Sequence, residues 1–239
     1  MTLNNILKEI KDNSDKSRAK VLSSFFKTGK GQYGEGDIFL GLTLPQSRSI
    51  AKKYLSLSLN DIDKLISSKI HEERLIALLI LVYRFEKDNN ERRSIFDFYI
   101  KNSKKINNWD LVDVSAHHIV GRFILDNEEN NSNLGSLLLK LAESENLWEK
   151  RISIVSTYYF IKNNRLDKTL EISKKLLNDK HDLIHKAVGW MLREVGKKNI
   201  LVLKKFLREN YSNLPRTTLR YAIERFPEKE RKSFLKGEI

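Results

Sequence analysis

The segment VLSSFF, Val21 to Phe26, carries the pattern that decides the fold. Its apolar residues stand at positions i, i+1, i+4 and i+5, which places them on one face of an α-helix. The same periodicity recurs along most of the chain, and no run of alternating polar and apolar residues competes with it as a strand. Only three prolines and ten glycines interrupt the 239 residues. The pattern therefore predicts an all-α protein.

The predicted helices follow one another with short polar turns between them. One longer break, from Thr28 to Pro45, holds five of the ten glycines and predicts a loop. After this loop we expect helices over residues 46–56, 60–68, 71–86, 91–101, 109–125, 133–144, 148–163, 166–178, 183–197, 199–209, 215–225 and 228–236. They come in pairs that recur about every 35–42 residues, the spacing of HEAT-like or armadillo-like repeats.

The expected architecture is a single HEAT-like repeat domain over residues 1–239. One helix pair cannot bury its own apolar face, so neighbouring pairs are expected to stack into a right-handed superhelical solenoid with a concave face. Hydrophobic residues make up 40% of the chain and charged residues 31%. A chain of this length and composition can bury a substantial core, which argues against wholesale disorder.

The charge balance predicts a polyanionic partner. Lys and Arg total 44 against 31 acidic residues, a formal net charge of +13. A field of this sign concentrates polyanions, and nucleic acid is the commonest large polyanion in a cell. A solvated basic surface is the plain alternative. An anionic membrane would favour one strongly basic amphipathic helix, whereas the charge here is spread along the chain.

The chain contains no cysteine, which removes disulfides, thiolate nucleophiles and cysteine-based metal sites. The segment Met1 to Lys11 lacks the apolar core of a signal peptide. The longest apolar run, Leu75 to Tyr83, is too short to span a bilayer. We therefore expect a cytoplasmic monomer without membrane contact, associated with the nucleoid when it binds DNA.

Two motifs resemble known signatures but lack the context that these signatures need. Gly29, Gly31 and Gly34 spell G-x-G-x-x-G, yet a helix and not a strand precedes them. We interpret this segment as an inter-helix loop. His181 and His185 have the spacing of two zinc ligands on a helix, but no third ligand is apparent. No metal and no other cofactor are expected.

The segment NNWDLVD, Asn107 to Asp113, carries the pattern that indicates chemistry. Trp109 and Asp113 are four residues apart and therefore share one helix face. An indole face attracts positive charge, and a carboxylate stabilises that charge further in a water-poor site. This pair suits a cationic or cation-developing ligand. The structural alternative is that Asp110 caps or pairs at a helix start and Trp109 packs in the core.

Two later segments add groups of the same kind. The segment LWEKR, Leu147 to Arg151, opens a helix with an arginine that could hold a phosphate. The segment AVGWMLRE, Ala187 to Glu194, places Trp190 within an apolar helix beside a glycine. Taken alone, Arg151 has the ordinary interpretation of a solvated or salt-bridged arginine, and Trp190 that of a core residue.

Together these segments resemble the AlkD family of bacterial DNA alkylation repair glycosylases. The resemblance rests on WDLVD from Trp109, on Trp148 with Arg151, and on KAVGWMLRE from Lys186, in that order. The loop YGEGDIFLG from Tyr33, with Pro45 and Arg48, is similar to the N-terminal loop and following helix of that family. The resemblance spans about residues 20–225. It implies a fold of HEAT-like repeats and the excision of cationic alkylated purines, such as N3-methyladenine and N7-methylguanine, from double-stranded DNA.

The resemblance also implies roles for the matching residues. Asp113 matches the catalytic carboxylate, and Trp109 and Trp190 match the two aromatic residues that contact the sugar of the lesion. A tyrosine of some members falls near Phe26, where this chain lacks the hydroxyl group. The residues expected at the DNA are Arg151, which matches a phosphate-contacting arginine, with Trp148, Phe26 and Arg193.

The implied reaction is that of a monofunctional glycosylase, which hydrolyses the N-glycosidic bond without a tight base-flipping pocket. We expect Asp113 to stabilise the positive charge that develops on the deoxyribose and to position the attacking water. Two alternatives remain. The chain is also compatible with a non-catalytic HEAT-repeat scaffold that binds duplex DNA or senses damage, and with a protein-interaction solenoid whose basic face meets an acidic partner.

Overall fold

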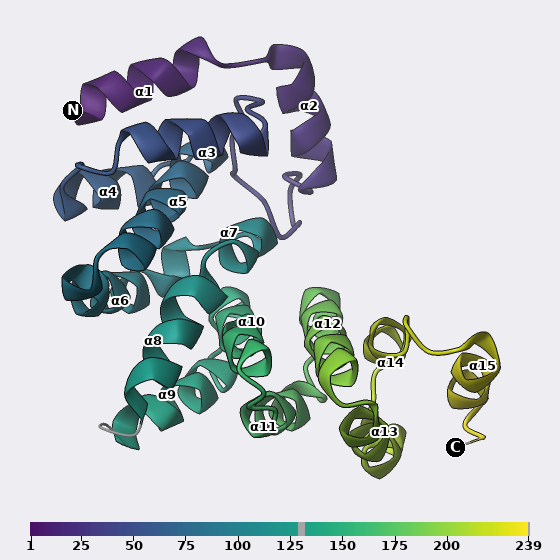
Figure 1. The fold of residues 1–239 in the computed structure, drawn as a ribbon. Helices are drawn as coiled ribbons and strands as arrows, with labels where there is room; N and C mark the ends of the chain where they lie inside the picture. Colours follow the sequence, from purple (N-terminus) through teal and green to yellow (C-terminus); the bar gives the residue numbers. More distant parts are fainter. Residues whose placement is uncertain (129–131, 239) are drawn as a thin grey trace. The chain divides into compact units, whose positions relative to one another are not determined.

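The computed structural model describes residues 1–128 and 132–238. Over these residues the chain is built of helices joined by turns and loops, and it contains no β-strand (Figure 1). A single backbone bridge pairs Ile38 with Ile70 in parallel. The prediction of an all-α protein is confirmed. By its internal contacts the chain divides into two compact units, Met1–Ser115 and Ala116–Ile239.

The N-terminal unit is organised around one buried helix. This helix, α5, spans His71–Lys87 and buries its residues from Leu75 to Val82 on all sides. A helix that is apolar all round belongs in a core, and α3 and α4 pack against it. The other helices of the unit are α1 (Leu3–Asp12), α2 (Lys16–Phe25), α3 (Leu44–Lys53), α4 (Leu59–Ile66), η1 (Asn89–Glu91), α6 (Arg92–Lys101), η2 (Ser103–Lys105) and α7 (Trp109–Asp113).

The glycine-rich break is a loop between α2 and α3, as predicted, and backbone hydrogen bonds hold it to the rest of this unit. Ile38 donates its N–H to the carbonyl of Lys69 at 3.0 Å and accepts the N–H of His71 at 2.9 Å. A side chain at Gly34 would place its Cβ only 2.4 Å from the carbonyl oxygen of Phe26. The loop therefore depends on a glycine at the point where it passes closest to the end of α2.

The prediction of one continuous helix over residues 109–125 is wrong, because the helix is interrupted after α7 ends at Asp113. The π-helical turn η3 (His117–Gly121) and the helix α8 (Arg122–Asn127) follow the break. The Ser115 hydroxyl lies 2.6 Å from the carbonyl of Leu111 and 2.9 Å from the hydroxyl of Tyr99. A serine that bonds back to the carbonyl four residues earlier bends a helix, and here α6 supplies Tyr99 to hold that serine in place.

The C-terminal unit is organised around two buried helices, α10 (Leu147–Lys162) and α12 (Asp182–Lys198), which pack against each other. Asn146 starts α10 by accepting the N–H groups of Trp148 and Glu149. Gly189 lets α12 approach the next helix, because a Cβ there would lie 2.5 Å from the Cβ of Tyr221. The other helices of this unit are α9 (Ser132–Ala142), α11 (Asp167–Leu176), α13 (Ile200–Glu209), η5 (Tyr211–Asn213), α14 (Arg216–Ala222) and α15 (Glu228–Lys236).

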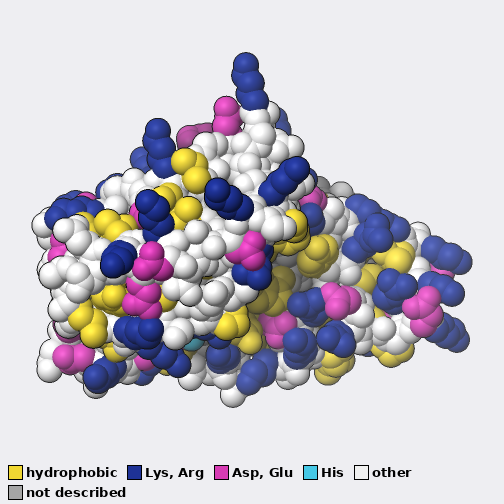
Figure 2. Space-filling model, turned by 90° about the horizontal axis from the view of Figure 1, so that it is seen from above, with side chains coloured by type: hydrophobic (Ala, Val, Ile, Leu, Met, Phe, Trp, Pro, Cys, Tyr) yellow, Lys and Arg dark blue, Asp and Glu magenta, His cyan; other side chains and the backbone are white. Residues whose placement is uncertain are grey.

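The remaining predicted helices are found, with ends that shift by a few residues. The helix predicted over 46–56, for example, is α3 and starts at Leu44, because Thr43 and Gln46 form a capping box in front of it. The single domain over residues 1–239 and the handedness of the superhelix stay predictions. No described helix is both long enough and apolar enough to cross a membrane. Lys and Arg side chains are spread over the surface seen in Figure 2, with Asp and Glu among them.

Candidate active site

A mostly apolar cavity of about 310 Å³ lies within the N-terminal unit. Its wall is formed by residues of α2 and the following loop, the start of α3, the first two turns of α5, and α7 with the residue after it. Trp109 and Asp113, the pair singled out by the sequence, both line it. The complete lining is Leu22, Phe26, Phe39, Leu42, Leu44, His71, Glu72, Leu75, Trp109, Asp110, Asp113 and Val114.

The short helix α7 places Trp109 and Asp113 toward this cavity. Asn108 begins α7 by accepting the N–H of Trp109 at 2.8 Å. The helix then runs for five residues, enough to bring the side chains at i and i+4 onto one face. The predicted common face of Trp109 and Asp113 is therefore observed. Both residues are half-buried, so a ligand in the cavity can reach them.

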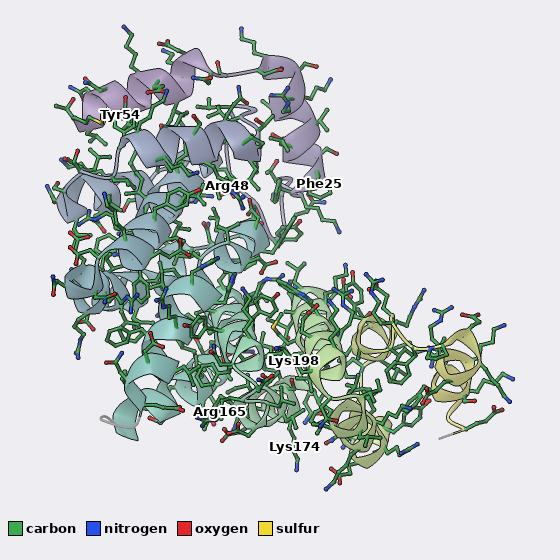
Figure 3. The ribbon with its side chains drawn as sticks, in the orientation of Figure 1. Phe25, Arg48, Tyr54, Arg165, Lys174 and Lys198 are labelled. Atoms are coloured by element: carbon green, nitrogen blue, oxygen red, sulfur yellow. The ribbon has the colours of Figure 1, made fainter. Side chains whose placement is uncertain are left out.

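Aromatic rings hold the indole of Trp109 in place. The ring of Phe26 stacks on it with 5.1 Å between centroids and an angle of 21°. Phe39 stacks on Phe26 in turn, at 5.0 Å and 18°. Phe25, at the end of α2 in Figure 3, contacts the indole edge-on at 6.0 Å and is 61% exposed. The stack orients the indole at the edge of the cavity.

The hydroxyl group beside Trp109 belongs to Tyr33. The indole Nε1–H donates to the Tyr33 hydroxyl oxygen at 3.2 Å. Phe26 is buried and contributes its ring face to the same indole. The resemblance drew attention to the missing hydroxyl at Phe26. The structure shows that a residue of the glycine-rich loop brings a phenol to Trp109 from another direction.

A buried histidine, which the sequence analysis missed, joins two carboxylates under the aromatic stack. His71 places Nε2 2.8 Å from Asp110 Oδ2 and Nδ1 3.3 Å from Asp37 Oδ2. Phe39 stacks on the imidazole at 4.5 Å. Burial alone would lower the pKa of His71, but the charge of Asp110 and the hydrogen bonds to both carboxylates outweigh burial and raise the pKa to about 9. His71 is therefore a cation at neutral pH.

Asp37 connects this histidine to a buried arginine. Its Oδ1 accepts a 2.7 Å hydrogen bond from Arg74, and its Oδ2 lies 3.3 Å from Asn108 Nδ2. Burial opposes ionisation of Asp37, but the hydrogen bond from His71 and the charge of Arg74 lower its pKa below the ordinary value. Two cations and two carboxylates thus form one compensated network, which is the arrangement in which buried charges persist.

Glu72 fixes the loop that forms the cavity wall. Its carboxylate accepts the backbone N–H groups of Leu40, Gly41 and Leu42 at 2.7–3.2 Å. The side chain is buried. From sequence, an acidic residue in the first turn of a helix indicates only a favourable contact with the helix dipole. The three loop donors come from residues about thirty positions earlier, so no local sequence pattern predicts these contacts.

The other predicted site residues belong to the C-terminal unit. Arg151 is 5% exposed and donates from Nη1 to the carbonyl of Leu183 at 2.7 Å. Trp148, one turn before it on α10, is also buried. Trp190 on α12 is half-buried, and its ring centroid lies 6.0 Å from that of Tyr158. Arg151 and Trp190 thus contact other residues of the C-terminal unit. The DNA contacts expected of all three residues stay predictions.

Arg193, one turn after Trp190 on α12, is held by two acidic side chains. Its Nη1 pairs with Glu224 and its Nε lies 3.7 Å from Glu194 Oε1. Its predicted contact with DNA also stays a prediction.

The two spaced histidines have structural partners. His181 accepts the N–H of Leu183 through Nδ1 at the start of α12, and His185 Nε2 lies 2.6 Å from the carbonyl oxygen of Asp179. Within residues 1–128 and 132–238, no three or more His, Cys, Asp or Glu side chains are grouped so that they could hold a metal ion.

Over the residues that the structure describes, the protein is all-helical and has an aromatic cavity that carries a tryptophan and an aspartate on one short helix. The family described as "DNA alkylation repair enzyme" matches residues 6–226. The chain belongs to this family.

A solved structure has the same fold. It is described as a predicted DNA alkylation repair enzyme from Enterococcus faecalis, and its TM-score with this chain is 0.69 at 16% sequence identity. The similarity covers 90% of this chain and 98% of the other. No curated protein matches the chain.

Proposed function

We propose that this protein is a DNA glycosylase that excises cationic alkylated purines from double-stranded DNA. The observation that carries the proposal is the shared cavity of Trp109 and Asp113, in which Phe26 stacks on the indole. The net charge of +13 supports a polyanionic substrate. Membership of a DNA alkylation repair family supports the type of lesion.

In the proposed reaction, the cavity stabilises a cation that develops as the bond breaks. An alkylated purine already carries positive charge, so it leaves with the electrons of the N-glycosidic bond and becomes neutral. Positive charge then builds on the deoxyribose, where the carboxylate of Asp113 and the face of Trp109 attract it. A water molecule attacks C1′ and transfers one proton to Asp113 or to solvent. The products are the free alkylated base and an abasic site.

The division of roles between the two aspartates of α7 supports Asp113 as the reacting carboxylate. Asp110 is paired with the cationic His71 at 2.8 Å and serves the buried network. Asp113 lines the cavity together with Trp109, which shares its helix face. We therefore assign the electrostatic and water-positioning role to Asp113 and a structural role to Asp110.

The lining of the cavity supports a reaction in which the base is not read in a tight pocket. His71, Glu72 and Asp110 are engaged within the protein. Most of the remaining lining is aliphatic or aromatic. A pocket that recognises a base by its edge needs convergent hydrogen-bonding groups, and this lining offers few. The proposal therefore keeps the modified base largely outside the protein.

For the C-terminal unit we propose contacts with the DNA backbone. Arg151, whose Nη1 donates to the carbonyl of Leu183, is proposed to contact a phosphate. Trp190 is proposed to contact a sugar, and Trp148 and Arg193 are proposed to contact the DNA.

The function is tested by incubating the wild-type protein with a duplex that contains N7-methylguanine and with the same duplex unmodified. We expect release of free methylated base from the first duplex alone. Binding of the modified duplex without release of any base would contradict the glycosylase proposal and would favour a non-catalytic damage-binding scaffold.

A further inference from the structure

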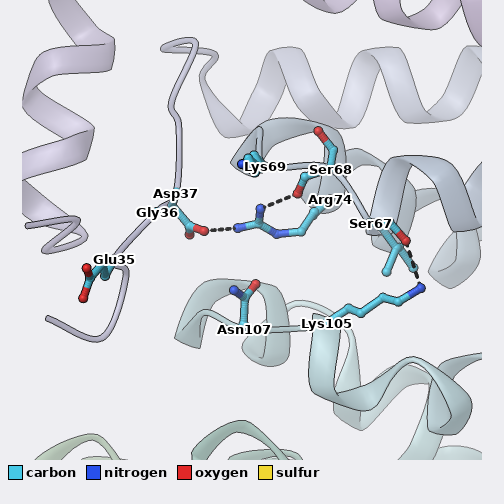
Figure 4. Close-up of a pocket in the computed structure, with 10 residues that line it drawn as sticks. Glu35, Gly36, Asp37, Ser67, Ser68, Lys69, Arg74, Lys105 and Asn107 are labelled. Carbon is cyan, nitrogen blue, oxygen red and sulfur yellow. Dashed lines mark hydrogen bonds and ion pairs between the residues drawn. The ribbon is translucent and has the colours of Figure 1, made fainter. Parts of the chain in front are cut away.

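A second cavity of the N-terminal unit, of about 280 Å³, differs from the first in that most of its lining residues are charged or polar (Figure 4). Three cationic side chains line it: Lys69, Arg74 and Lys105. Its acidic lining residues are Glu35 and Asp37. The remaining lining residues are Gly36, Ile66, Ser67, Ser68 and Asn107.

Arg74 lines this cavity and has one side-chain donor without a partner among the described residues. The residue is 3% exposed, and its two terminal nitrogens donate to the carbonyl of Ser68 and to Asp37 Oδ1, each at 2.7 Å. Its Nε is buried and has no hydrogen-bond partner among the described residues. A buried donor without a partner is costly and calls for an explanation, such as a bound ligand.

Asn107 adds a second polar group without a partner on the same wall. In the part of the chain that the structure describes, its Oδ1 is buried and makes no hydrogen bond. Asn107 and Arg74 both line this cavity (Figure 4). Rotation of the amide by half a turn would present the NH₂ group instead, so Asn107 can serve a ligand oxygen as a donor.

The acidic residues of the lining are already engaged with donors of the protein. Asp37 is held by His71, Arg74 and Asn108. Glu35 accepts the backbone N–H of Gly31 at 2.7 Å. Lys69 and Lys105 are exposed at this cavity, and the Lys105 ammonium lies 2.8 Å from the Ser67 hydroxyl. Lys105 also pairs with Asp63 at 3.3 Å. The site thus combines the Nε donor of Arg74 with the positive charges of two exposed lysines.

We propose that this cavity is an oxyanion site that binds a phosphate group. A tetrahedral oxyanion accepts several N–H donors at once, which suits an arginine edge beside an amide, and lysines add charge without strict geometry. The proposal rests on the proposed function in one respect: it takes the backbone of the bound DNA as the source of the phosphate.

The site is connected to the cavity of Trp109 by a series of direct contacts. Arg74 contacts Asp37 at 2.7 Å, Asp37 contacts His71 at 3.3 Å, and His71 contacts Asp110 at 2.8 Å. A phosphate held by Arg74 would therefore bind one end of a network whose other end fixes the first turn of α7. We infer that the oxyanion site positions the DNA backbone and α7 together.

Nuclear magnetic resonance of the full chain tests the site with inorganic phosphate as the probe. We expect the Nε–H signal of Arg74 and the side-chain amide of Asn107 to shift saturably. The double variant Lys69→Ala/Lys105→Ala should raise the Kd for phosphate by about tenfold, because two neighbouring charges are lost. The matched control, Lys20→Ala/Lys174→Ala, removes two exposed lysines that line neither cavity and should leave the Kd unchanged. The absence of saturable shifts, or equal effects of the two double variants, would overturn the proposal.

Undamaged duplex DNA then identifies the source of the phosphate. Saturating duplex should displace inorganic phosphate, and Lys69→Ala/Lys105→Ala should lower the salt dependence of duplex binding by about one phosphate contact. Phosphate that stays bound in the presence of the duplex would overturn the DNA-backbone assignment and show a site for a free anion. Neither measurement uses base release, so a failure here is distinguishable from a failure of the glycosylase proposal.

Discussion

The imidazole of His71 lies 2.8 Å from the carboxylate of Asp110, and Asp110 directly follows Trp109 in the chain. This contact holds the start of α7 against α5. Both acidic residues of α7 line the cavity, and Asp110 is in addition paired with His71. The stability of this network and the reactivity of Asp113 can therefore be tested separately.

Asp37 is expected to contribute strongly to stability. The variant Asp37→Asn removes the charge that compensates His71 and Arg74 in a buried place, which should lower the free energy of unfolding by on the order of 3 kcal/mol. The control Asp97→Asn breaks an exposed ion pair with Arg93 and should cost less than about 1 kcal/mol. Urea unfolding followed by circular dichroism measures both. Equal effects of the two variants would show that the buried network stabilises the protein no more than an exposed ion pair does.

Stability should fall on the alkaline side of neutrality. The folded-state pKa of His71 is raised to about 9, above its ordinary value of 6.5. The protonated form, which faces Asp37, Asp110 and Arg74, is thus favoured by folding. Its contribution is fully present below about pH 6.5 and is lost as the pH rises through 9. Urea unfolding between pH 6 and pH 10 should show this loss in the wild type and not in His71→Gln. The same slope in both proteins would contradict the assignment.

On the acid side of neutrality, stability should change with pH in the opposite direction. The pKa of Asp37 is lowered in the folded state, so its contribution is present at neutral pH and is lost as the pH falls through the folded-state value. An unfolding series between pH 5 and pH 2 should therefore show a steeper loss in the wild type than in Asp37→Asn. The network should therefore be most stable at pH values between the folded-state pKa of Asp37 and that of His71.

The helices and the Trp109–Asp113 pair could be predicted from the sequence because both depend on spacing along one helix. The buried network could not, because its contacts join residues 34 to 39 positions apart. The interruption after Asp113 escaped prediction for the same reason, since Tyr99 of another helix holds Ser115. Arg151 shows a further limit: its residue type suggests a surface contact, whereas its burial depends on the neighbouring helices.

The close approach of Gly34 to the end of α2 predicts a sharp difference between two glycine variants. Gly34→Ala would place Cβ 2.4 Å from the carbonyl of Phe26 and should destabilise the protein and disturb the Phe26–Trp109 stack. Gly135→Ala meets no atom within 4 Å and lies inside α9, so it should stabilise by up to about 1 kcal/mol. Thermal unfolding with tryptophan fluorescence compares them. A harmless Gly34→Ala would contradict the role given to this loop.

Duplex binding should depend steeply on salt and little on sequence. Phosphates neutralised by Lys and Arg release counterions, so the affinity should fall with rising salt on any duplex. Arg151→Ala should weaken binding alike on duplexes of different sequence, once circular dichroism has shown that the variant is folded. An effect restricted to one sequence would mean that Arg151 contacts bases instead of the backbone.

The most direct test of the account is single-turnover release of N7-methylguanine by Asp113→Asn. This variant keeps the shape of the side chain and removes its charge, so excision should slow by roughly 10-fold to 1000-fold, while binding to undamaged duplex stays the same or tightens. The control Asp97→Asn, which changes an exposed aspartate of α6, should release base at the wild-type rate. An Asp113→Asn protein as fast as the wild type would contradict the assignment, and Trp109 and Asp113 would then be structural residues of a DNA-binding scaffold.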